Sequence, residues 1–138
     1  MSEKYYIDSC IWRDYFENRS DKFRPLGEWA FTLLKKIIQD NNLIIYSDLV
    51  EEELQITYSE KEIKNIFSII PNKILIKVET SAKQLKEAIK LSKEFNIPTK
   101  DALHVILARD NNSILITRDK HFYEIEKQIT IRKPEELI

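Results

Sequence analysis

Four acidic residues in this chain stand beside apolar runs instead of inside hydrophilic stretches. They are Asp8 in YYIDS, Glu53 in SDLVEEEL, Asp101 in PTKDALHVILA and Asp119 in SILITRDKHF. A charge that only needs solvation requires no apolar neighbour, whereas a charge positioned by a strand end or a helix start has one. The pattern predicts a metal site that folding assembles from distant parts of the chain.

The chemistry of such a site follows from its ligands. Carboxylates gathered at one edge of a sheet repel each other, and a cation between them removes the repulsion. Ligation by oxygen alone selects a hard ion such as Mg²⁺ or Mn²⁺. Both ions assist phosphoryl chemistry by polarising the phosphoryl oxygens and by activating water. The residues therefore favour a phosphodiesterase or a nuclease.

Each acidic residue also has a simpler structural explanation. Asp101 would lie in the first turn of a helix, where a carboxylate gains about 0.3–1 kcal/mol from the helix dipole. Asp8 and Asp119 would be capping or turn residues after strands. Glu53 follows two other glutamates, and either of them could face the site instead. The joint occurrence of all four favours the metal site.

The composition suits a small intracellular protein. With 138 residues, one domain over residues 1–138 is expected. The net charge of -1, from 22 basic and 23 acidic residues, argues neither for nor against a nucleic-acid partner. The lone cysteine, Cys10, is expected to pack as a small apolar group in a reducing compartment. The start of the chain lacks a signal-peptide pattern and no apolar run approaches a membrane span, so we expect a soluble, cytoplasmic protein.

Glycine and histidine usage excludes two other classes of site. Gly27 is the single glycine, whereas a Walker loop and a dinucleotide-binding fingerprint each need several. His104 and His121 have no second histidine or cysteine at ligand spacing, which disfavours a zinc site. We expect His104 to be packed and hydrogen-bonded, and His121 to have an ordinary surface role.

Apolar periodicity predicts short strands separated mostly by helices. Strands are expected at residues 5–7, 43–46, 74–78, 114–117 and 129–131, and helices starting near residues 9, 25, 48, 59, 81 and 100. This alternation indicates an α/β fold with a parallel sheet. Four strands are almost wholly apolar, as expected when both faces are covered. We therefore expect a three-layer α/β/α sandwich with a central, mainly parallel sheet of about five strands.

Two of the expected helices follow one another directly in the sequence. The helix over residues 81–95 is amphipathic and predicts Leu85, Ile89 and Phe95 facing inward. The helix over residues 100–110 is the most apolar, and Thr99 is expected to cap it. The outward face of the helix over residues 81–95 carries a row of lysines, most simply explained as a solvated surface: Lys83, Lys86, Lys90 and Lys93.

These elements explain how the four acids can meet. In an open parallel sheet, ligands bind beyond the carboxyl ends of the strands. Asp8 and Asp119 are expected at two such ends. Glu53 would lie in the helix after the second strand, and Asp101 in the first turn of the helix before the fourth. All four can then point over the same edge of the sheet.

At the level of motifs, the chain resembles the PIN domain, the ribonuclease fold of VapC-type toxins of toxin–antitoxin pairs, over nearly its whole length. The matching segments are YYIDSCIW, YSDLVEEEL, PTKDALHVILA and ILITRDKHF, and the second of them selects Glu53 over its two neighbours. The third and fourth segments are the most distinctive. A haloacid dehalogenase-like phosphatase also opens with a strand and an aspartate, but Cys10 stands where its second acid belongs.

The resemblance implies metal-dependent hydrolysis of a phosphodiester in RNA. The expected ligands of one or two Mg²⁺ or Mn²⁺ ions are Asp8, Glu53, Asp101 and Asp119, some of them acting through water. Ser9 and Thr117 are expected to support a carboxylate or a bound water, with a plain capping role as the alternative. Four cations that flank the acids are expected to hold the RNA backbone, unless they are only solvated: Arg13, Lys100, Arg118 and Lys120.

The resemblance also implies partners. A small antitoxin protein is expected, and so is a homodimer, for which the apolar helices near residues 11–16 and 25–38 offer surface. Two other functions stay open. The same nuclease chemistry could serve RNA processing or quality control, or a catalytically silent PIN fold could bind RNA or protein.

Overall fold

The strands form a single parallel sheet in the computed structural model, which describes residues 2–125 and 129–138. They are β1 (Lys4–Ile7), β2 (Leu43–Ser47), β3 (Leu75–Val78), β4 (Ile114–Ile116) and β5 (Ile131–Arg132). Their order is β3-β2-β1-β4-β5, and each neighbouring pair is parallel. The carboxyl ends of β1 and β4, which Asp8 and Thr117 follow directly, are therefore adjacent.

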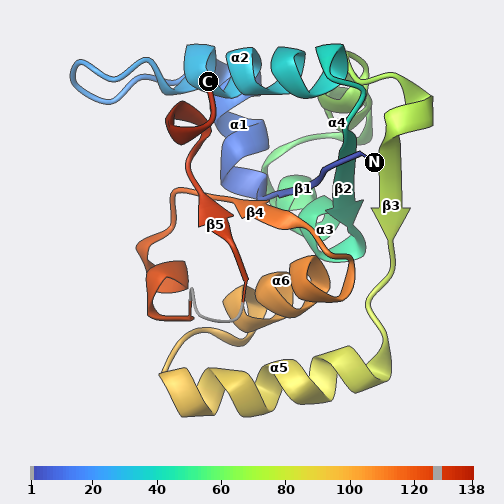
Figure 1. Cartoon of the computed structure of the whole chain (residues 1–138), viewed down its shortest axis with the longest axis vertical. Coiled ribbons are helices and arrows are strands. Elements are labelled where there is room, and N and C mark those ends of the chain that lie inside the picture. The colour runs from blue at the N-terminus through green and yellow to red at the C-terminus, as the bar shows by residue number, and fades with distance from the viewer. Residues whose placement is uncertain (1, 126–128) are drawn as a thin grey trace.

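Helices connect the strands and cover both faces of the sheet. They are α1 (Ser9–Glu17), α2 (Leu26–Gln39), α3 (Asp48–Thr57), α4 (Glu60–Phe67), α5 (Ala82–Phe95) and α6 (Thr99–Asp110), with short 3-10 helices η1 (Asn72–Ile74), η2 (Lys120–Ile125) and η3 (Pro134–Glu136). Figure 1 shows α1 and α2 on one side of the sheet and α5 and α6 on the other. The predicted α/β/α fold is confirmed, with element ends shifted by one or two residues. Within the described ranges, no helix is long and apolar enough to cross a membrane.

Two helix starts bear on the predicted site. α3 begins after Ser47, whose hydroxyl accepts a hydrogen bond from the Val50 amide at 3.1 Å, as expected of an N-cap. α6 begins differently from the prediction, because Pro98 stands at its N-cap and Thr99 is its first residue. The Thr99 hydroxyl instead donates to Ser92 Oγ of α5 at 3.3 Å. This contact ties the end of α5 to the start of α6.

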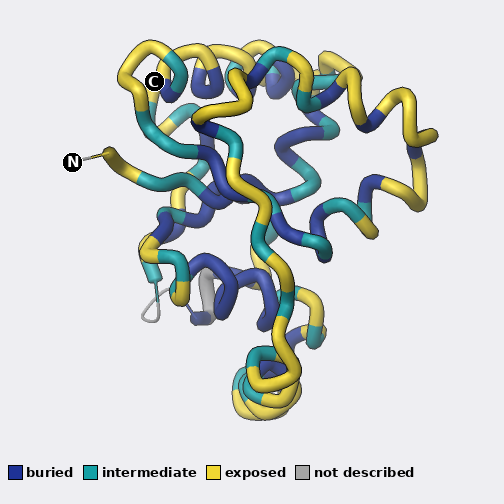
Figure 2. The backbone as a smooth tube through the Cα atoms, turned by 90° about the vertical axis from the view of Figure 1, so that its right-hand side faces the viewer, coloured by how far each residue is buried: buried dark blue, intermediate teal, exposed yellow. Residues whose placement is uncertain are grey.

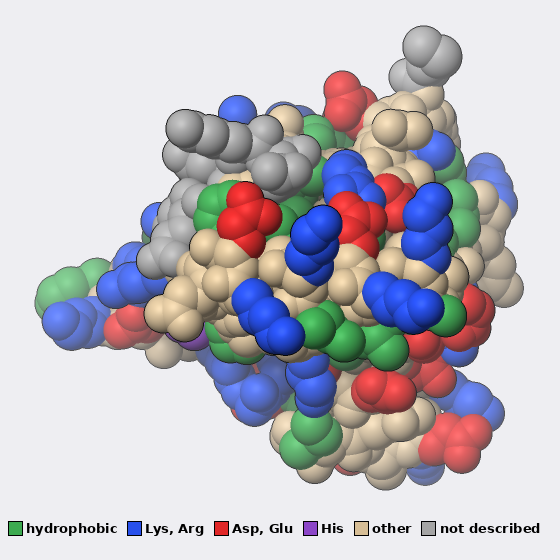
Figure 3. Space-filling view, turned by 90° about the horizontal axis from the view of Figure 1, so that it is seen from below, with side chains coloured by type: hydrophobic (Ala, Val, Ile, Leu, Met, Phe, Trp, Pro, Cys, Tyr) green, Lys and Arg blue, Asp and Glu red, His purple; other side chains and the backbone are tan. Residues whose placement is uncertain are grey.

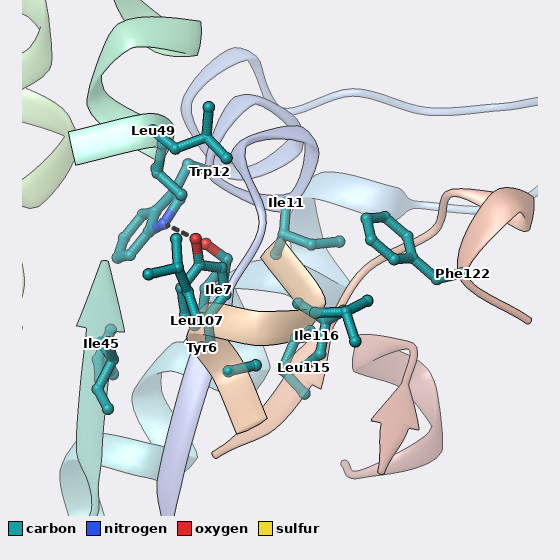
Figure 4. Close-up of a cluster of buried hydrophobic side chains, with 14 of the residues drawn as sticks. Tyr6, Ile7, Ile11, Trp12, Ile45, Leu49, Leu107, Leu115, Ile116 and Phe122 are labelled. Atoms are coloured by element: carbon teal, nitrogen blue, oxygen red, sulfur yellow. Dashed lines mark hydrogen bonds between the residues drawn. The ribbon is translucent and has the colours of Figure 1, made fainter. Parts of the chain in front are cut away.

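The core lies between the sheet and its covering helices. Trp12 of α1 is fully buried, and its indole Nε1 donates to the Ile7 carbonyl oxygen at 3.2 Å (Figure 4). On the other face, α6 is buried continuously over Ala102–Ala108. A helix that is buried on all sides is enclosed between two layers, here the sheet and α5. Such packing fixes the orientation of the side chains in this stretch, His104 among them.

α5 is the outermost layer and is only lightly buried. Its buried residues are Ala88 and Ser92, whereas Leu85 and Ile89 are 45% and 42% exposed. The prediction that Leu85 and Ile89 face inward is wrong, because α5 contacts the rest of the protein through a narrow strip of small side chains against α6. Figure 2, in which α5 is seen end-on at the bottom, shows mostly exposed and intermediate backbone there.

Gly27 marks a close approach of α1 and α2. A Cβ atom at this position would lie 2.5 Å from Asn18 Cα and 2.7 Å from the Asp14 carbonyl oxygen. A larger residue would therefore push backbone atoms apart. The glycine lets α2 pack against the end of α1, the helix that begins beside Asp8.

Candidate metal centre

Asp8 is held rigidly at the junction of β1 and α1. It caps α1, with Oδ1 accepting from the Ser9 amide at 2.8 Å. Its other oxygen, Oδ2, accepts from the Thr117 hydroxyl at 2.7 Å and from the Cys10 thiol at 3.4 Å. Burial, and then the charge of Asp8, raises the pKa of Cys10 well above its usual value, so the thiol is a neutral donor. Cys10 packs against the hydrophobic core, as predicted, and its thiol in addition donates to Asp8.

Glu53 approaches Asp8 from α3. Its Oε1 accepts from the Ser9 hydroxyl at 3.0 Å and lies 2.8 Å from His104 Nε2. The two preceding glutamates point elsewhere, since Glu51 pairs with Lys77 Nζ at 3.0 Å and Glu52 is exposed. The geometry therefore agrees with the choice of Glu53 from the three glutamates.

His104 connects this acidic pair to the core. Its side chain is 1% exposed, its Nδ1 lies 2.7 Å from Tyr6 Oη, and that hydroxyl lies 2.7 Å from Ser47 Oγ. On the other side of the ring, Nε2 is 3.6 Å from Asp8 Oδ1. His104 is packed and hydrogen-bonded, as predicted. The sequence did not indicate that it would also contact Glu53.

The electrostatics of this pair favour a protonated His104 beside an ionised Glu53. Burial alone lowers the pKa of His104, but the hydrogen bond to Glu53 and the charges of Asp8, Glu53 and Asp101 outweigh it, and the pKa is raised. Burial also opposes ionisation of Glu53, yet the hydrogen bond and charge of His104 lower its pKa overall.

The other two predicted acids form a second group around His121. Asp101, in the first turn of α6, has Oδ2 3.0 Å from His121 Nδ1, and Asp119 Oδ1 lies 3.2 Å from the same nitrogen. Burial, and then the charge of Asp119, raises the pKa of Asp101. His121 is 57% exposed, but its contacts with both acids contradict an ordinary surface role.

The two groups are neighbours. Thr117 Oγ1 donates to Asp8 and accepts from the Asp119 amide at 3.1 Å, so one hydroxyl contacts both groups. From α6, Asp101 adds to the charge that raises the pKa of His104. The structure therefore brings all four predicted acids to the carboxyl edge of the sheet, in two pairs. Ser9 and Thr117 lie where a supporting role requires them.

The donor atoms of each group suit a divalent cation. In Asp8, Glu53 and His104, one atom of each residue lies within 4.8 Å of the others, and the same holds for Asp101, Asp119 and His121. Each group offers two carboxylates and one imidazole. The sequence predicted oxygen donors alone. A neutral imidazole nitrogen is compatible with Mn²⁺ and would make the donor set less selective for Mg²⁺, whereas a protonated His104 can only donate to Glu53.

Both histidines left a signal in the sequence. His104 lies three residues after Asp101, a spacing that puts two side chains on the same face of a helix. His121 lies two residues after Asp119, within reach of the same turn. Neither was expected to be a ligand, because neither has a second histidine or cysteine at ligand spacing. Each histidine instead contacts carboxylates from other elements of the fold.

The four cations predicted to bind RNA have different surroundings. Arg118 is only 14% exposed, and it bonds Asp14 at 3.3 Å and Glu135 at 2.9 Å. Arg13 lies 3.8 Å from Glu17 on the same helix. Lys100 and Lys120 are exposed, and the charge of Lys100 helps to lower the pKa of Glu53. Arg118 has a structural role, and the two lysines are the cations that face solvent near the acids.

Comparisons with known proteins agree with this description. A family model described as PIN domain matches residues 5–128. No curated protein matched the sequence. Among solved structures, VapBC2 from Rickettsia felis bound to a promoter DNA fragment is similar with a TM-score of 0.68 and 21% identity, covering 94% of this chain and 98% of that one. A toxin–antitoxin complex from Klebsiella pneumoniae gives 0.67 and 18%, covering 94% and 97%, and FitAcB from Neisseria gonorrhoeae gives 0.63 and 14%, covering 96% and 99%.

Proposed function

The chain belongs to the PIN domain family, and on this premise we propose that it is a Mg²⁺- or Mn²⁺-dependent endoribonuclease, which hydrolyses phosphodiester bonds in RNA. The observation that carries the proposal is the pairing of its four carboxylates at the carboxyl edge of the sheet, each pair with a histidine. Two histidines can offset the charge of at most two of the four neighbouring carboxylates, and a divalent cation would remove the remaining repulsion.

In this proposal Asp8, Glu53, Asp101 and Asp119 hold one or two metal ions. When bound, the metal neutralises charge on the phosphoryl oxygens and activates the attacking water. The hydroxyls of Ser9 and Thr117 orient Glu53 and Asp8. His104 contacts the same Glu53 oxygen as Ser9, and Tyr6 fixes the ring of His104 through Nδ1. The proposed metal ligands are therefore already held in place in the metal-free protein.

We also propose that this nuclease is the toxin of a type II toxin–antitoxin pair. The similarity to solved toxin–antitoxin proteins supports this role and the expectation of a small antitoxin partner. Since the proposed substrate is cellular RNA, the proposed site of action is the cytoplasm. We expect a small reading frame beside the gene. Its product should copurify with this chain and stop RNA cleavage. A nuclease without such a partner would fit RNA processing or quality control instead.

The proposed homodimer has a candidate surface on α1 and α2. Phe31 is 42% exposed and stacks on Tyr15, with ring centroids 5.8 Å apart. An exposed aromatic pair of this kind is favourable to bury in an interface. Light scattering should then give a dimer mass that does not fall with rising salt, and Phe31→Asp should give the monomer mass. A monomer at every concentration would contradict the dimer.

Cleavage of a mixed single-stranded RNA pool tests the nuclease itself. We expect cleavage with Mn²⁺ or Mg²⁺, none in EDTA, and none by Glu53→Gln. The matched control is Glu52→Gln, which removes the same charge from an exposed neighbour and should cleave like the wild type. Cleavage that persists in EDTA would contradict the metal mechanism. Intact RNA in all samples, together with no metal binding, would favour a catalytically silent PIN fold.

A further inference from the structure

The outward face of α5 carries a row of lysines. Lys83, Lys86, Lys90 and Lys93 follow one another at intervals of three and four residues, which puts them on one face of the helix. From Lys83 to Lys93, ten intervals along the helix, the row is about 15 Å long, given a rise of about 1.5 Å per residue. Figure 3, which views the α5 end of the protein from below, shows Lys and Arg side chains along this surface with hydrophobic atoms between them.

The charge of the row is largely unpaired. Within the described parts of the chain, Lys86, Lys90 and Lys93 form no ion pair. The helix also carries Glu87 and Glu94, but Glu87 is bound by Arg109 of α6 at 2.9 Å. One of the two carboxylates on α5 is therefore already paired with another helix. The net charge of the chain, -1, hides this local excess of positive charge.

The row leads to the candidate metal centre. Ser92, which precedes Lys93, accepts the hydrogen bond from Thr99 at the start of α6. The next two residues of α6 are Lys100, which is exposed, and Asp101 of the second acidic group. A strand of RNA that enters the site beside Asp101 can thus continue over Lys100 and Lys93 along α5.

We propose that this face of α5 binds the backbone of single-stranded RNA flanking the cleavage site, an inference that rests on the proposed ribonuclease function. Lysines are mobile point charges that hold phosphates of any sequence. Leu85 and Ile89, exposed beside the row, give the unstacked bases of a single strand an apolar surface to contact. The acids would hold the metal that acts on one phosphodiester, and the α5 lysines hold the neighbouring nucleotides.

Salt dependence of RNA binding tests the proposal. The probes are an oligouridylate of about 30 nucleotides and one of about 4 nucleotides, which fills the site alone. Binding is measured in EDTA, where the proposed cleavage does not run. Lys86, Lys90 and Lys93 are changed to Gln together. The matched control changes Lys22, Lys61 and Lys73 to Gln, which removes the same charge from exposed positions away from α5. Circular dichroism checks that each variant is folded.

The expected result is specific to the long probe. Each phosphate contact contributes about 0.7 to the slope of log affinity against log salt for a single strand, so the α5 variant should have a slope smaller by about 2. Between 50 and 200 mM salt, the wild type should then lose about 20-fold more affinity than the variant. The control variant should match the wild type, and all three proteins should bind the short probe equally.

Two results would overturn the inference. One is an equal slope for the α5 variant and the control variant on the long probe. The other is an equal loss of affinity on the short probe, which would mean that the lysines act on the site and not on flanking RNA. Failure of the nuclease proposal looks different. In that case no protein cleaves RNA with Mn²⁺, while the difference in slope on the long probe persists.

Discussion

Thr117 Oγ1 lies 2.7 Å from Asp8 Oδ2 and donates a hydrogen bond to it, across the ends of two neighbouring parallel strands. The same oxygen accepts the amide hydrogen of Asp119 at 3.1 Å. One buried hydroxyl therefore bonds the carboxylate of Asp8 and the backbone amide of Asp119, and so connects the two acidic groups. This arrangement makes Thr117 a positioning residue with a measurable effect on metal binding.

Replacing Thr117 with Val should weaken Mn²⁺ binding by about 10- to 100-fold, the usual effect of losing a hydrogen bond that orients a ligand. It should also lower the free energy of unfolding by about 1–3 kcal/mol, because a buried carboxylate loses a donor. Thr117→Ser keeps the hydroxyl and should stay close to the wild type. Calorimetry and urea unfolding give the two quantities. Equal metal affinity for the Val and Ser variants would contradict a positioning role.

Tyr6→Phe should destabilise the protein through His104. The lost hydroxyl leaves His104 Nδ1 and Ser47 Oγ without their 2.7 Å partner in the core, at a cost of about 1–3 kcal/mol. Tyr5→Phe is the control, since Tyr5 is half-buried and its hydroxyl has no hydrogen bond to the described residues. Urea unfolding compares the two variants. A similar stability for both would mean that the buried hydrogen bonds contribute little.

The stability of the metal-free protein should depend on the pH through His104. Its pKa is raised in the folded state above its usual value of 6.5, so the folded protein binds this proton more tightly. The resulting stabilisation is complete below pH 6.5 and is lost as the pH rises through the folded pKa. Urea unfolding in EDTA across this range should show the decline, and His104→Gln should abolish it. A decline of the same size in the variant would mean that groups other than His104 cause the loss of stability.

Glu53 should act in the opposite direction. Its pKa is lowered below its usual value of 4.5, so it stabilises the protein above pH 4.5, and this contribution disappears as the pH falls through the folded pKa. Glu53 contributes fully above pH 4.5 and His104 fully below pH 6.5. The pair should therefore stabilise the protein most between these two pH values. Glu53→Gln should remove the acidic part of the profile, whereas Glu52→Gln should retain it.

Arg118→Gln should separate structure from RNA binding. Arg118 bonds Asp14 of α1 and Glu135 of η3, and its guanidinium lies 5.7 Å from the centre of the Trp29 ring. Its loss should lower the free energy of unfolding by about 1–3 kcal/mol, because the buried Asp14 loses a partner. RNA affinity of the folded variant should be unchanged. Lys100→Gln should instead leave stability intact and weaken RNA binding. The reverse pattern would restore Arg118 as an RNA contact.

The sequence was informative where local rules decide the structure. Apolar periodicity and turn residues located each strand and helix to within one or two residues. The four acids could be selected because each of them follows or precedes an apolar element, and the carboxyl ends of parallel strands meet at one edge. For Asp8, which directly follows β1, this rule predicted a position beside the end of a neighbouring strand. The structure places it beside the end of β4, in contact with Thr117.

Other features depended on contacts between distant residues. Glu53 meets His104 across 51 residues, and Arg118 meets Asp14 across 104, and no local pattern specifies either pair. Leu85 and Ile89 were expected to be buried because α5 is amphipathic. How wide a strip α5 buries depends instead on its packing against α6, which α5 contacts through the small side chains of Ala88 and Ser92.

The central claim is that the paired carboxylates bind divalent cations, and titration of the metal-free protein with Mn²⁺ in a calorimeter tests it most directly. We predict saturable binding of one or two ions to the wild type and to Glu52→Gln. We predict loss of binding in Asp8→Asn and in Asp101→Asn, each still folded by circular dichroism. Equal binding by all four proteins, or no binding by the wild type, would contradict the account.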